Sequence, residues 1–261
     1  MGDALAGRVA LVTGASRGIG AAIARRFGAE GARVAIVARS LEPGSGGHLA
    51  GSLQETAGAI EAAGGVALPI VADLSDAACD RPAIVHRAEA ELGPVDVLVN
   101  NAAACFFLSI DETSERRLRV AYEVNVVTPY LLTKAVVPGM RARGKGWIVN
   151  ITSAIVDTDH LESPQQARSS TYAPSKAALD RLTISFATEL AGTGIAVNAL
   201  APERAVATEG ATAVMDIPPE WCEPVEMMAD ATLALATCDP GVTNGVVVRS
   251  GPFLRARGAG S

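Results

Sequence analysis

The chain has 261 residues, of which 49% are hydrophobic and 19% are charged. This composition provides a sizeable buried core and favours one α/β domain, residues 1–261, over two small domains. The net charge of −6, from 22 basic and 28 acidic side chains, argues against a nucleic-acid-binding surface.

Nothing along the sequence predicts export or membrane insertion. The start of the chain lacks the basic region and apolar run of a signal peptide. No apolar stretch approaches the ~20 residues that a membrane span needs. The four cysteines are scattered, without the spacing of a disulfide framework or a zinc site. The sequence therefore predicts a cytoplasmic protein with reduced thiols and no membrane partner.

The first strand–turn–helix unit predicts a dinucleotide site. A buried-strand run over residues 8–13 leads into a glycine-rich turn, residues 14–20, and then into a helix from Ala21. Glycines let the backbone approach a pyrophosphate, and the helix N-terminus offers N–H groups and a favourable dipole. The alternative is a glycine-rich turn that binds nothing, but the strand and the helix beside it favour the site. The expected contacts are Gly14, Ser16, Arg17, Gly18, Ile19 and Gly20.

The end of the second strand, residues 33–37, bears on the choice of cofactor. NAD sites usually place a carboxylate there for the ribose hydroxyls, whereas NADP sites use arginine for the 2′-phosphate. This chain has no acid at that point; Arg39 and Ser40 stand there, and Arg17 lies in the glycine turn. Each arginine alone would be read as a solvated surface residue. Together with the missing acid, they predict NADP(H) in preference to NAD(H).

The rest of the chain continues as alternating helices and strands. These elements predict a Rossmann-type, doubly wound parallel sheet of about seven strands with helices on both faces. A segment of about 208–223 is expected to form a lid. The expected elements are helix 53–63, strand 66–71, helix 76–92, strand 95–99, a helical stretch 114–143 interrupted near Asn125 and Pro129, strand 146–151, helix 170–191, strand 195–200, helix 224–237 and strand 244–248.

Polar residues at strand ends are further site candidates, each with a plainer alternative. Asp73 could hold an adenine edge or cap the helix that follows it. Asn125 could serve the site or fill backbone hydrogen bonds left open by the helix break. Ser153 follows strand 146–151 on the ligand side of the sheet, although a serine there is usually loop. His48 and His160 lie in loops and are expected to be exposed.

Tyr172 and Lys176 are one helical turn apart, so a helix places them on one face. An ammonium about 4 Å from a phenol, at an effective dielectric of ~20, contributes roughly 4 kcal/mol. That energy is enough to lower the pKa of the phenol from ~10 toward ~7, so that it exchanges protons at working pH. The spacing alone equally fits a surface pair on an ordinary helix.

From about residue 7 to residue 250, the chain resembles the short-chain dehydrogenase/reductase family in its single-domain form. The resemblance rests on motifs in the family's order: residues 13–20, Asp73-Leu74, Asn100-Asn101-Ala102, Asn125, Ser153 and Tyr172-x-x-x-Lys176. It implies a catalytic tetrad of Asn125, Ser153, Tyr172 and Lys176. It also implies assembly as a homodimer or homotetramer, and further cofactor contacts from Asp73, Leu74, Asn101, Ala102, Tyr172, Lys176 and Pro202.

The chain departs from the family pattern in three places. Ala103 stands where the family usually has glycine, and Glu203 replaces the glycine that usually follows the proline at Pro202. Ser153 and Tyr172 are 19 positions apart, against about a dozen in the family. The added loop, about 157–164, is expected to wall the substrate pocket.

The expected function is that of an NADP(H)-preferring carbonyl reductase, with the reverse oxidation open. In this mechanism Tyr172 gives a proton to the carbonyl oxygen as hydride reaches the carbon. Ser153 holds that oxygen, Lys176 lowers the pKa of the tyrosine and binds the nicotinamide ribose, and Asn125 supports a water path to the lysine. The partner is a small carbonyl or alcohol. Trp221, Met227, Met228 and Pro218-Pro219 suggest an apolar one, but these residues would equally serve a core or a subunit contact.

Two alternatives remain open at the level of sequence. One is a catalytically silent NADP-binding regulatory protein, which the presence of Tyr172 and Lys176 disfavours. The other is a family member with dehydratase or epimerase chemistry, which the intact tetrad disfavours and Glu203 leaves possible.

Overall fold

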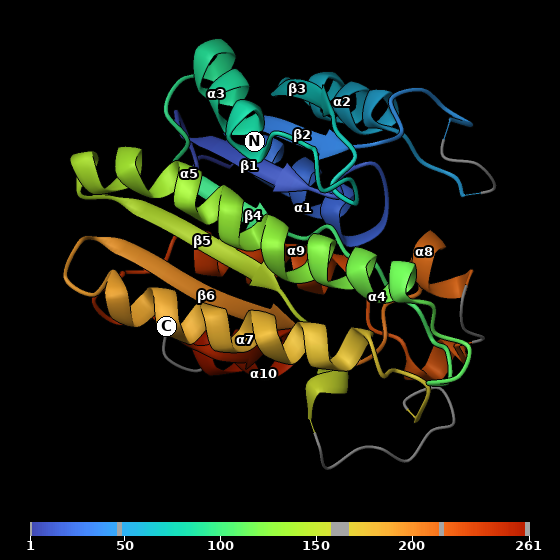
Figure 1. Ribbon diagram of the computed structural model, residues 1–261. Coiled ribbons are helices and arrows are strands. Elements are labelled where there is room, and N and C mark those ends of the chain that lie inside the picture. Colours follow the sequence, from blue (N-terminus) through green and yellow to red (C-terminus); the bar gives the residue numbers. More distant parts are fainter. Residues whose placement is uncertain (1, 46–48, 158–166, 214–216, 259–261) are drawn as a thin grey trace.

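The computed structural model describes residues 2–45, 49–157, 167–213 and 217–258 (Figure 1). Seven parallel strands form one sheet in the order β3-β2-β1-β4-β5-β6-β7. His48 and His160 lie outside the described residues. The strands are β1 (Val9–Thr13), β2 (Arg33–Ala38), β3 (Val66–Val71), β4 (Val97–Asn100), β5 (Gly146–Ile151), β6 (Ile195–Ala201) and β7 (Val247–Arg249).

Helices cover both faces of the sheet, so the predicted doubly wound fold is confirmed. One face carries α1 (Gly18–Ala29), α2 (Leu53–Ala62) and α9 (Val225–Ala236). The other carries α3 (Arg81–Leu92), α5 (Thr128–Arg143) and α7 (Tyr172–Glu189). Short elements complete the chain: α4 (Glu115–Tyr122), η1 (Glu123–Val127), η2 (Ala154–Val156), α8 (Glu209–Thr212), η4 (Pro219–Trp221) and α10 (Ser250–Gly258).

The strand side chains divide between two cores because successive residues of a strand point to opposite faces. In β1, Ala10 and Val12 pack in the core under α1 and α9, whereas Val9 and Leu11 pack in the core under α3 and α5. All five residues of β1 are buried. A strand buried on both faces reads as a continuous apolar run, which is how this strand was predicted.

The carboxyl ends of the strands gather at one edge, where the site candidates lie. β1 pairs with β2 on one side and with β4 on the other, so the strand order reverses direction at β1. Ligands of open α/β sheets bind outside the carboxyl ends at such a reversal. The glycine turn follows β1 at this point. Within the described part of the chain, no helix combines the length and apolar character required to cross a membrane.

Several predicted boundaries differ from the observed ones, two of them for identifiable local reasons. The helix expected over 76–92 begins only at Arg81, because Asp80 caps it by accepting a hydrogen bond from the Ala83 amide at 3.0 Å. The strand expected over 244–248 begins at Val247. Asn244 instead accepts a hydrogen bond from the Val197 amide through its side chain, at 2.9 Å. The C-terminal helix α10 was not predicted.

Candidate active site

The glycine turn is fixed against the loop that follows β4. The side chain of Asn101 donates to the carbonyl oxygens of Thr13 and Gly14, at 2.9 and 3.2 Å, and the Thr13 hydroxyl accepts from the amides of Asn101 and Ala102, at 3.0 Å each. A Cβ at Gly20 would come within 2.3 Å of the Asn101 amide nitrogen. Only glycine fits there, and the structure brings the predicted residues of both loops together.

Arginine and hydroxyl groups lie at the outer end of the turn, where the sequence predicts a 2′-phosphate contact. Arg17 donates to the carbonyl of Gly51 at 3.0 Å and to the hydroxyl of Ser40 at 3.4 Å. Its Nε is buried and has no hydrogen-bond partner among the described residues. Arg17, Arg25 and Gly51 help to line a cavity of about 270 Å³ together with the acids Glu55 and Glu209, and Arg39 is exposed at the end of β2. A buried unpaired donor beside a second cation fits a phosphate group.

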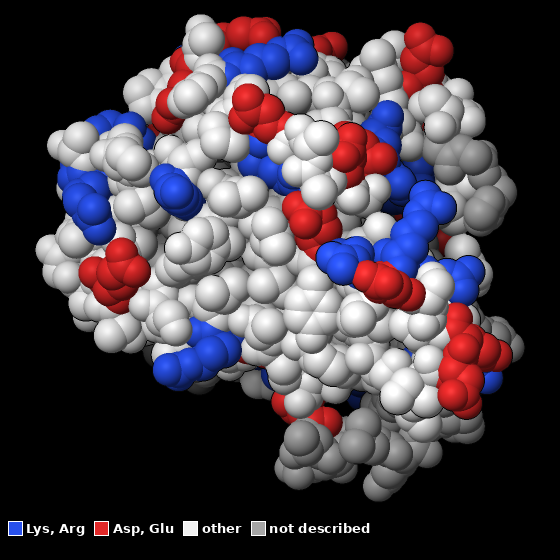
Figure 2. Space-filling model, in the orientation of Figure 1, with Lys and Arg blue, Asp and Glu red and all other residues white. Residues whose placement is uncertain are grey.

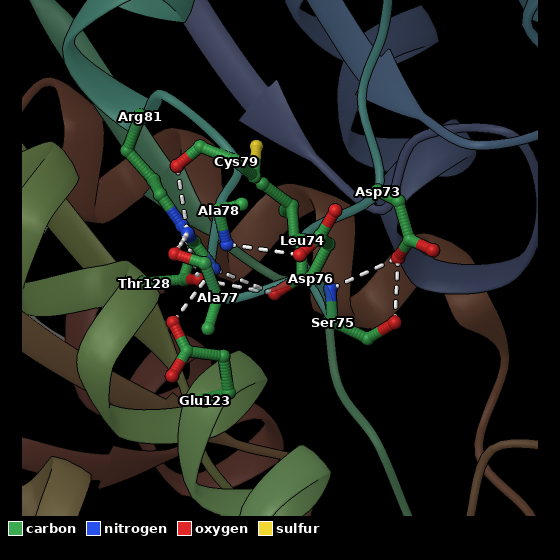
Figure 3. Close-up of polar contacts among 10 residues, drawn as sticks. All are labelled: Asp73, Leu74, Ser75, Asp76, Ala77, Ala78, Cys79, Arg81, Glu123 and Thr128. Atoms are coloured by element: carbon green, nitrogen blue, oxygen red, sulfur yellow. Dashed lines mark hydrogen bonds and ion pairs between the residues drawn. The ribbon is translucent and has the colours of Figure 1, made fainter.

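Asp73 forms a turn rather than a helix cap. Its Oδ1 accepts from the amide of Ser75 at 2.9 Å and from the Ser75 hydroxyl at 2.6 Å (Figure 3). Partial burial opposes ionisation, but these hydrogen bonds and the charges of Arg39 and Arg81 hold the pKa of Asp73 below its usual range. The alternative role as an N-cap is wrong, because the helix begins at Arg81. Leu74, next to Asp73, is largely buried.

Ser153 and Tyr172 lie together although 19 positions separate them in the chain. The Ser153 hydroxyl is a neighbour of the Tyr172 phenol and acts to lower its pKa. Ser153 lies just after β5, and its hydroxyl accepts a hydrogen bond from the amide of Ile155 at 3.3 Å. Tyr172 is the first residue of α7. The Phe107 ring meets the Tyr172 ring edge-on, with centroids 6.0 Å apart. The phenol therefore has a hydroxyl partner and an apolar wall.

Lys176 lies behind the tyrosine, in the interior. Its Nζ donates to the carbonyl of Ile151 at 2.7 Å and lies 5.8 Å from the centroid of the Tyr172 ring. The side chain is 2% exposed, and burial lowers the pKa of Lys176 to about 8, although the charge of Asp180 acts in the opposite direction. The ammonium is thus anchored to the end of β5, one strand away from β4 and the Asn101 loop.

The prediction that Lys176 lowers the pKa of Tyr172 is wrong for this structure. Burial raises the pKa of Tyr172 above its ordinary value, the neighbouring Cys105 adds to the rise, and the Ser153 hydroxyl offsets only part of it. The lysine charge lies over the ring at 5.8 Å from its centroid and is already engaged by a carbonyl. The phenol is therefore protonated at neutral pH.

Asn125 is at the centre of a single π-helical turn, η1, between α4 and α5. The predicted helix interruption is present at this position. The side chain is fully buried, donates to the carbonyl of Ala104 and the hydroxyl of Ser175 at 2.9 Å each, and accepts from the Ala104 amide at 2.9 Å. Asn125 therefore joins the loop after β4 to the first turn of α7. π-Helical turns of this kind occur frequently at functional sites.

Four residues of the site were not singled out from the sequence. Ser175 is fully buried and donates to the Tyr172 carbonyl at 2.7 Å, which couples Asn125 to the tyrosine. Burial raises the pKa of Cys105 to about 12 and that of Asp180 to about 6. Phe107, described above, is the fourth. Only Asp180 had a usable signal, because it lies one helical turn beyond Lys176.

Two of the three departures from the family pattern can be followed in the structure, whereas the added loop is outside the described residues except for Asp157. Ala103 has an ordinary backbone conformation, since none of the described non-glycine residues has a positive φ. The Glu203 carboxylate accepts two hydrogen bonds from Arg255 of α10, at 2.9 and 3.1 Å, and these hold the pKa of Glu203 below its usual range. The negative charge of Glu203 is therefore paired with Arg255 in the C-terminal helix. Pro202 accepts from Arg249 at 3.3 Å through its carbonyl.

The apolar residues that suggest an apolar substrate have different surroundings in the structure. Met228 is fully buried in the core beneath α9, so it cannot contact a substrate. Trp221 is 65% exposed. A separate hollow of about 440 Å³, lined in part by Lys145, Trp147 and Asp239, lies at the amino ends of β5 and β6. It is remote from the tetrad.

The fold and the site define a class of protein: a Rossmann-type domain with a nucleotide turn and a Ser–Tyr–Lys group at the same sheet edge. Residues 8–216 match the family model described as short chain dehydrogenase. The chain belongs to the short-chain dehydrogenase family, whose members are oxidoreductases.

Several curated relatives are similar to this chain. A short chain dehydrogenase of Pseudocercospora fijiensis is 40% identical over 200 residues, covering 76% of this chain and 60% of the relative. The human hydroxysteroid dehydrogenase-like protein 2 is 32% identical over 249 residues, covering 94% of this chain and 57% of the relative. The chain therefore spans somewhat over half the length of these two relatives.

Solved structures agree with this placement. A short chain dehydrogenase from Mycobacterium thermoresistibile has a TM-score of 0.84 at 32% identity, covering 97% of this chain and 88% of that one. A metagenomic short-chain oxidoreductase in complex with NADP has a TM-score of 0.76 at 32% identity, covering 94% of this chain and 97% of that one.

Proposed function

We propose that this protein is an NADP(H)-preferring reductase that converts a carbonyl compound to an alcohol. The observation that carries the proposal is the placement of Ser153 beside Tyr172, with Lys176 behind it, at the sheet edge that also bears the glycine turn. NADPH, when bound, supplies the hydride. The proposed residues of its site are Gly14, Ser16, Arg17, Gly18, Ile19, Gly20, Arg39, Ser40, Asp73, Leu74, Asn101, Ala102, Tyr172, Lys176 and Pro202.

The side chains of the chain itself handle the proton. A carbonyl oxygen placed against Ser153 and Tyr172 receives two hydrogen bonds, which stabilise the negative charge that develops on it. Tyr172 then gives its proton to that oxygen as general acid. Lys176 then returns a proton to the tyrosine, and the water path proposed beside Asn125 brings a proton from solvent back to Lys176.

A Tyr172 phenol that carries its proton is the form that the acid step of reduction requires. Burial favours this form because it keeps the pKa of Tyr172 high. Oxidation of an alcohol requires the phenolate, which the same burial disfavours. An alkoxide is a stronger base than a phenolate, so the transfer to a developing alkoxide remains favourable.

The substrate class is open to a direct screen. Purified protein is mixed with NADPH and a panel of aldehydes, cyclic ketones, steroids and 3-oxoacyl thioesters, and consumption of NADPH is followed. We expect at least one apolar carbonyl compound to be reduced, because Phe107 faces the Tyr172 ring. Binding of NADPH with no consumption on any member would contradict the proposed function and favour the silent-binder alternative.

The preference for NADP(H) is supported from two sides. Arg17 has a buried unpaired Nε beside Ser40, and Arg39 is exposed at the end of β2. Among the solved neighbours, the metagenomic oxidoreductase holds NADP. A charge-assisted contact is worth about 1.5–3 kcal/mol, so the preference should be roughly ten- to hundredfold.

Replacing Arg39 by aspartate should reverse the cofactor preference. The new carboxylate repels the 2′-phosphate and can accept hydrogen bonds from the ribose hydroxyls of NADH. The dissociation constants of NADPH and NADH are measured by fluorescence titration for wild type and Arg39→Asp. Arg116→Asp, the same charge change at an exposed site on α4, is the control. Equal binding of both cofactors by wild type would refute the preference.

We also propose a homodimer or homotetramer assembled through α5 and α7. Figure 2 shows an uncharged area over these helices in the middle of the face, with charged side chains around it. Tyr130 and Ile184 there are 45% and 37% exposed, and Tyr130 packs against Phe186 with ring centroids 5.4 Å apart. An apolar face shared by two helices suits pairing across a two-fold axis.

The assembly is tested by sedimentation equilibrium at micromolar concentration. Wild type should have two or four times the chain mass of 26.6 kDa. Ile184→Glu should shift it to the monomer, because a buried unpaired charge in the contact is strongly unfavourable. Val66→Glu, at a site that is 47% exposed on the edge strand β3, at the other end of the sheet from β6, should leave the mass unchanged. A wild-type monomer would contradict the assembly.

The remaining expectations concern the lid and the location. We propose that 208–223 closes over the site within one catalytic domain spanning 1–261. In support, Thr208 lies beside Gly18 of the glycine turn, and Ala205, just before the segment, pairs with Cys222 near its end; residues 214–216 are outside the described residues. A cytoplasmic location with reduced thiols remains our proposal; fractionation of cells and thiol titration test it.

A further inference from the structure

Arg81 is a buried cation outside the catalytic group. It opens α3 and is 1% exposed. Its guanidinium donates five hydrogen bonds at 2.7 to 3.3 Å (Figure 3). An arginine is almost never fully buried unless its charge and its donors are paired. The acceptors therefore show which parts of the molecule this side chain joins.

Three of the acceptors belong to the loop that follows β3. Arg81 donates to the carbonyl oxygens of Leu74, Ala77 and Cys79, at 3.0, 3.2 and 2.7 Å. This is the loop of Asp73, whose own side chain closes a turn with Ser75. Under the proposed function, the same loop holds the adenosine end of the cofactor.

The other two acceptors flank the π-helical turn. Arg81 forms an ion pair with Glu123 at 2.7 Å and donates to the hydroxyl of Thr128 at 3.3 Å. Glu123 opens η1 and Thr128 opens α5, so the guanidinium holds both ends of the turn that contains Asn125. The Thr128 hydroxyl also donates to the Leu74 carbonyl at 3.4 Å, which adds a second link to the loop.

Packing of the helices does not account for this arrangement. The apolar residues Ile84 and Val85 of α3 already lie in one core with Leu132 and Val136 of α5. Arg81 adds polar links to the loop and to the π turn, neither of which is part of that apolar contact. A π turn is a rare conformation that local sequence does not stabilise by itself.

We propose that Arg81 is a positioning residue that couples the adenosine end of the cofactor site to the catalytic turn of Asn125. The coupling rests on the proposed function for the identity of the ligand. When the loop of Leu74 is ordered by the adenosine group, Arg81 transmits that order to η1. Asn125 is then held against Ala104 and Ser175, and so against the first turn of α7 that carries Tyr172.

Hydrogen exchange with a fragment of the cofactor tests the coupling without turnover. The probe is 2′,5′-ADP, which has the adenosine and the 2′-phosphate but no nicotinamide, so it cannot reach the tetrad. In wild type it should slow exchange of peptides over 14–20 and also over 123–128. In Arg81→Met, protection of 14–20 should remain and protection of 123–128 should be lost.

The matched control is Arg143→Met on α5. Arg143 also donates to a loop carbonyl, that of Val95, at 2.7 Å, but it lies at the far end of the helix. With no ligand present, exchange over 123–128 should be roughly tenfold faster in Arg81→Met and unchanged in Arg143→Met, as for a local opening confined to the turn. If Arg81→Met does not fold, the same exchange measurement is made on Arg81→Lys, which keeps the positive charge.

Comparing kcat in the single and double variants distinguishes positioning through Asn125 from a general structural role of Arg81. If Arg81 acts through Asn125, the losses in kcat of Arg81→Met and Asn125→Ala should not multiply in the double variant. Exchange over 123–128 that is the same in Arg81→Met and Arg143→Met would overturn the inference, as would wild-type protection confined to 14–20. Absence of carbonyl reduction in wild type would refute the proposed function but leave these exchange results decisive for Arg81.

Discussion

Tyr172→Phe should lower kcat by roughly 10²–10⁴, the usual contribution of a positioned general acid. The substitution removes one oxygen and leaves the ring against Phe107, so the fold and the affinity for NADPH should stay nearly intact. The loss should fall on kcat, because the phenol proton is required in the transition state and not for cofactor binding. Steady-state kinetics and NADPH titration measure both.

Tyr130→Phe is the control for the loss of a phenol oxygen. Tyr130 is half-exposed on α5 and its ring packs on Phe186, away from Ser153. This variant should keep the wild-type rate. Full turnover in Tyr172→Phe, together with inactivity of Glu203→Gln, would show that the mechanism is wrong and would point to chemistry at the carboxylate.

Lys176→Ala should lower both the turnover and the affinity for NADPH, because the lysine is proposed to act on the tyrosine and on the cofactor. The ammonium is 2% exposed and anchors to the Ile151 carbonyl, and the proposal also gives it a ribose contact. Turnover should fall by at least ~10². NADPH should bind roughly ten- to hundredfold more weakly, the value of a charge-assisted hydrogen bond.

The pH profile separates the two roles of the lysine. Because burial lowers the pKa of Lys176 to about 8, the wild-type rate should fall as pH rises through that value and the ammonium loses its proton. The residual activity of Lys176→Ala should lack this limb. Lys145→Ala, exposed at the opposite edge of the sheet near Trp147, should leave both the profile and NADPH affinity unchanged. An unaltered dissociation constant in Lys176→Ala would contradict the ribose contact.

Much of the fold was readable from the sequence because local and global signals agree in it. The run at β1, the glycine turn and the helix after it each predict the same unit, and β3 was predicted with its observed bounds, residues 66–71. The helix of α3 was misplaced because Asp76 and Asp80 both offer caps. The second is selected locally, because Pro82 is tolerated in the first turn of a helix but would break one that began at residue 76.

The electrostatics of the site could not be read in the same way. The spacing of Tyr172 and Lys176 predicts their proximity, but the pKa of the phenol depends on burial by segments far away in the chain. The same holds for Glu203. Its partner Arg255 is 52 positions away, on a helix that the sequence does not predict, so nothing near Glu203 in the sequence indicates this ion pair. The links made by Arg81 likewise have no local signal.

The central claim, hydride transfer to a carbonyl with Tyr172 as the acid, is tested most directly by isotopic labelling. The protein is incubated with NADPH carrying deuterium at the transferable position of the nicotinamide and with the carbonyl compound selected in the screen, and the product is analysed by mass spectrometry. We expect one deuterium on the carbinol carbon with wild type and essentially no labelled alcohol with Tyr172→Phe over the same time. Labelled alcohol formed at equal rates by both proteins, or a product formed without deuterium, would contradict the account.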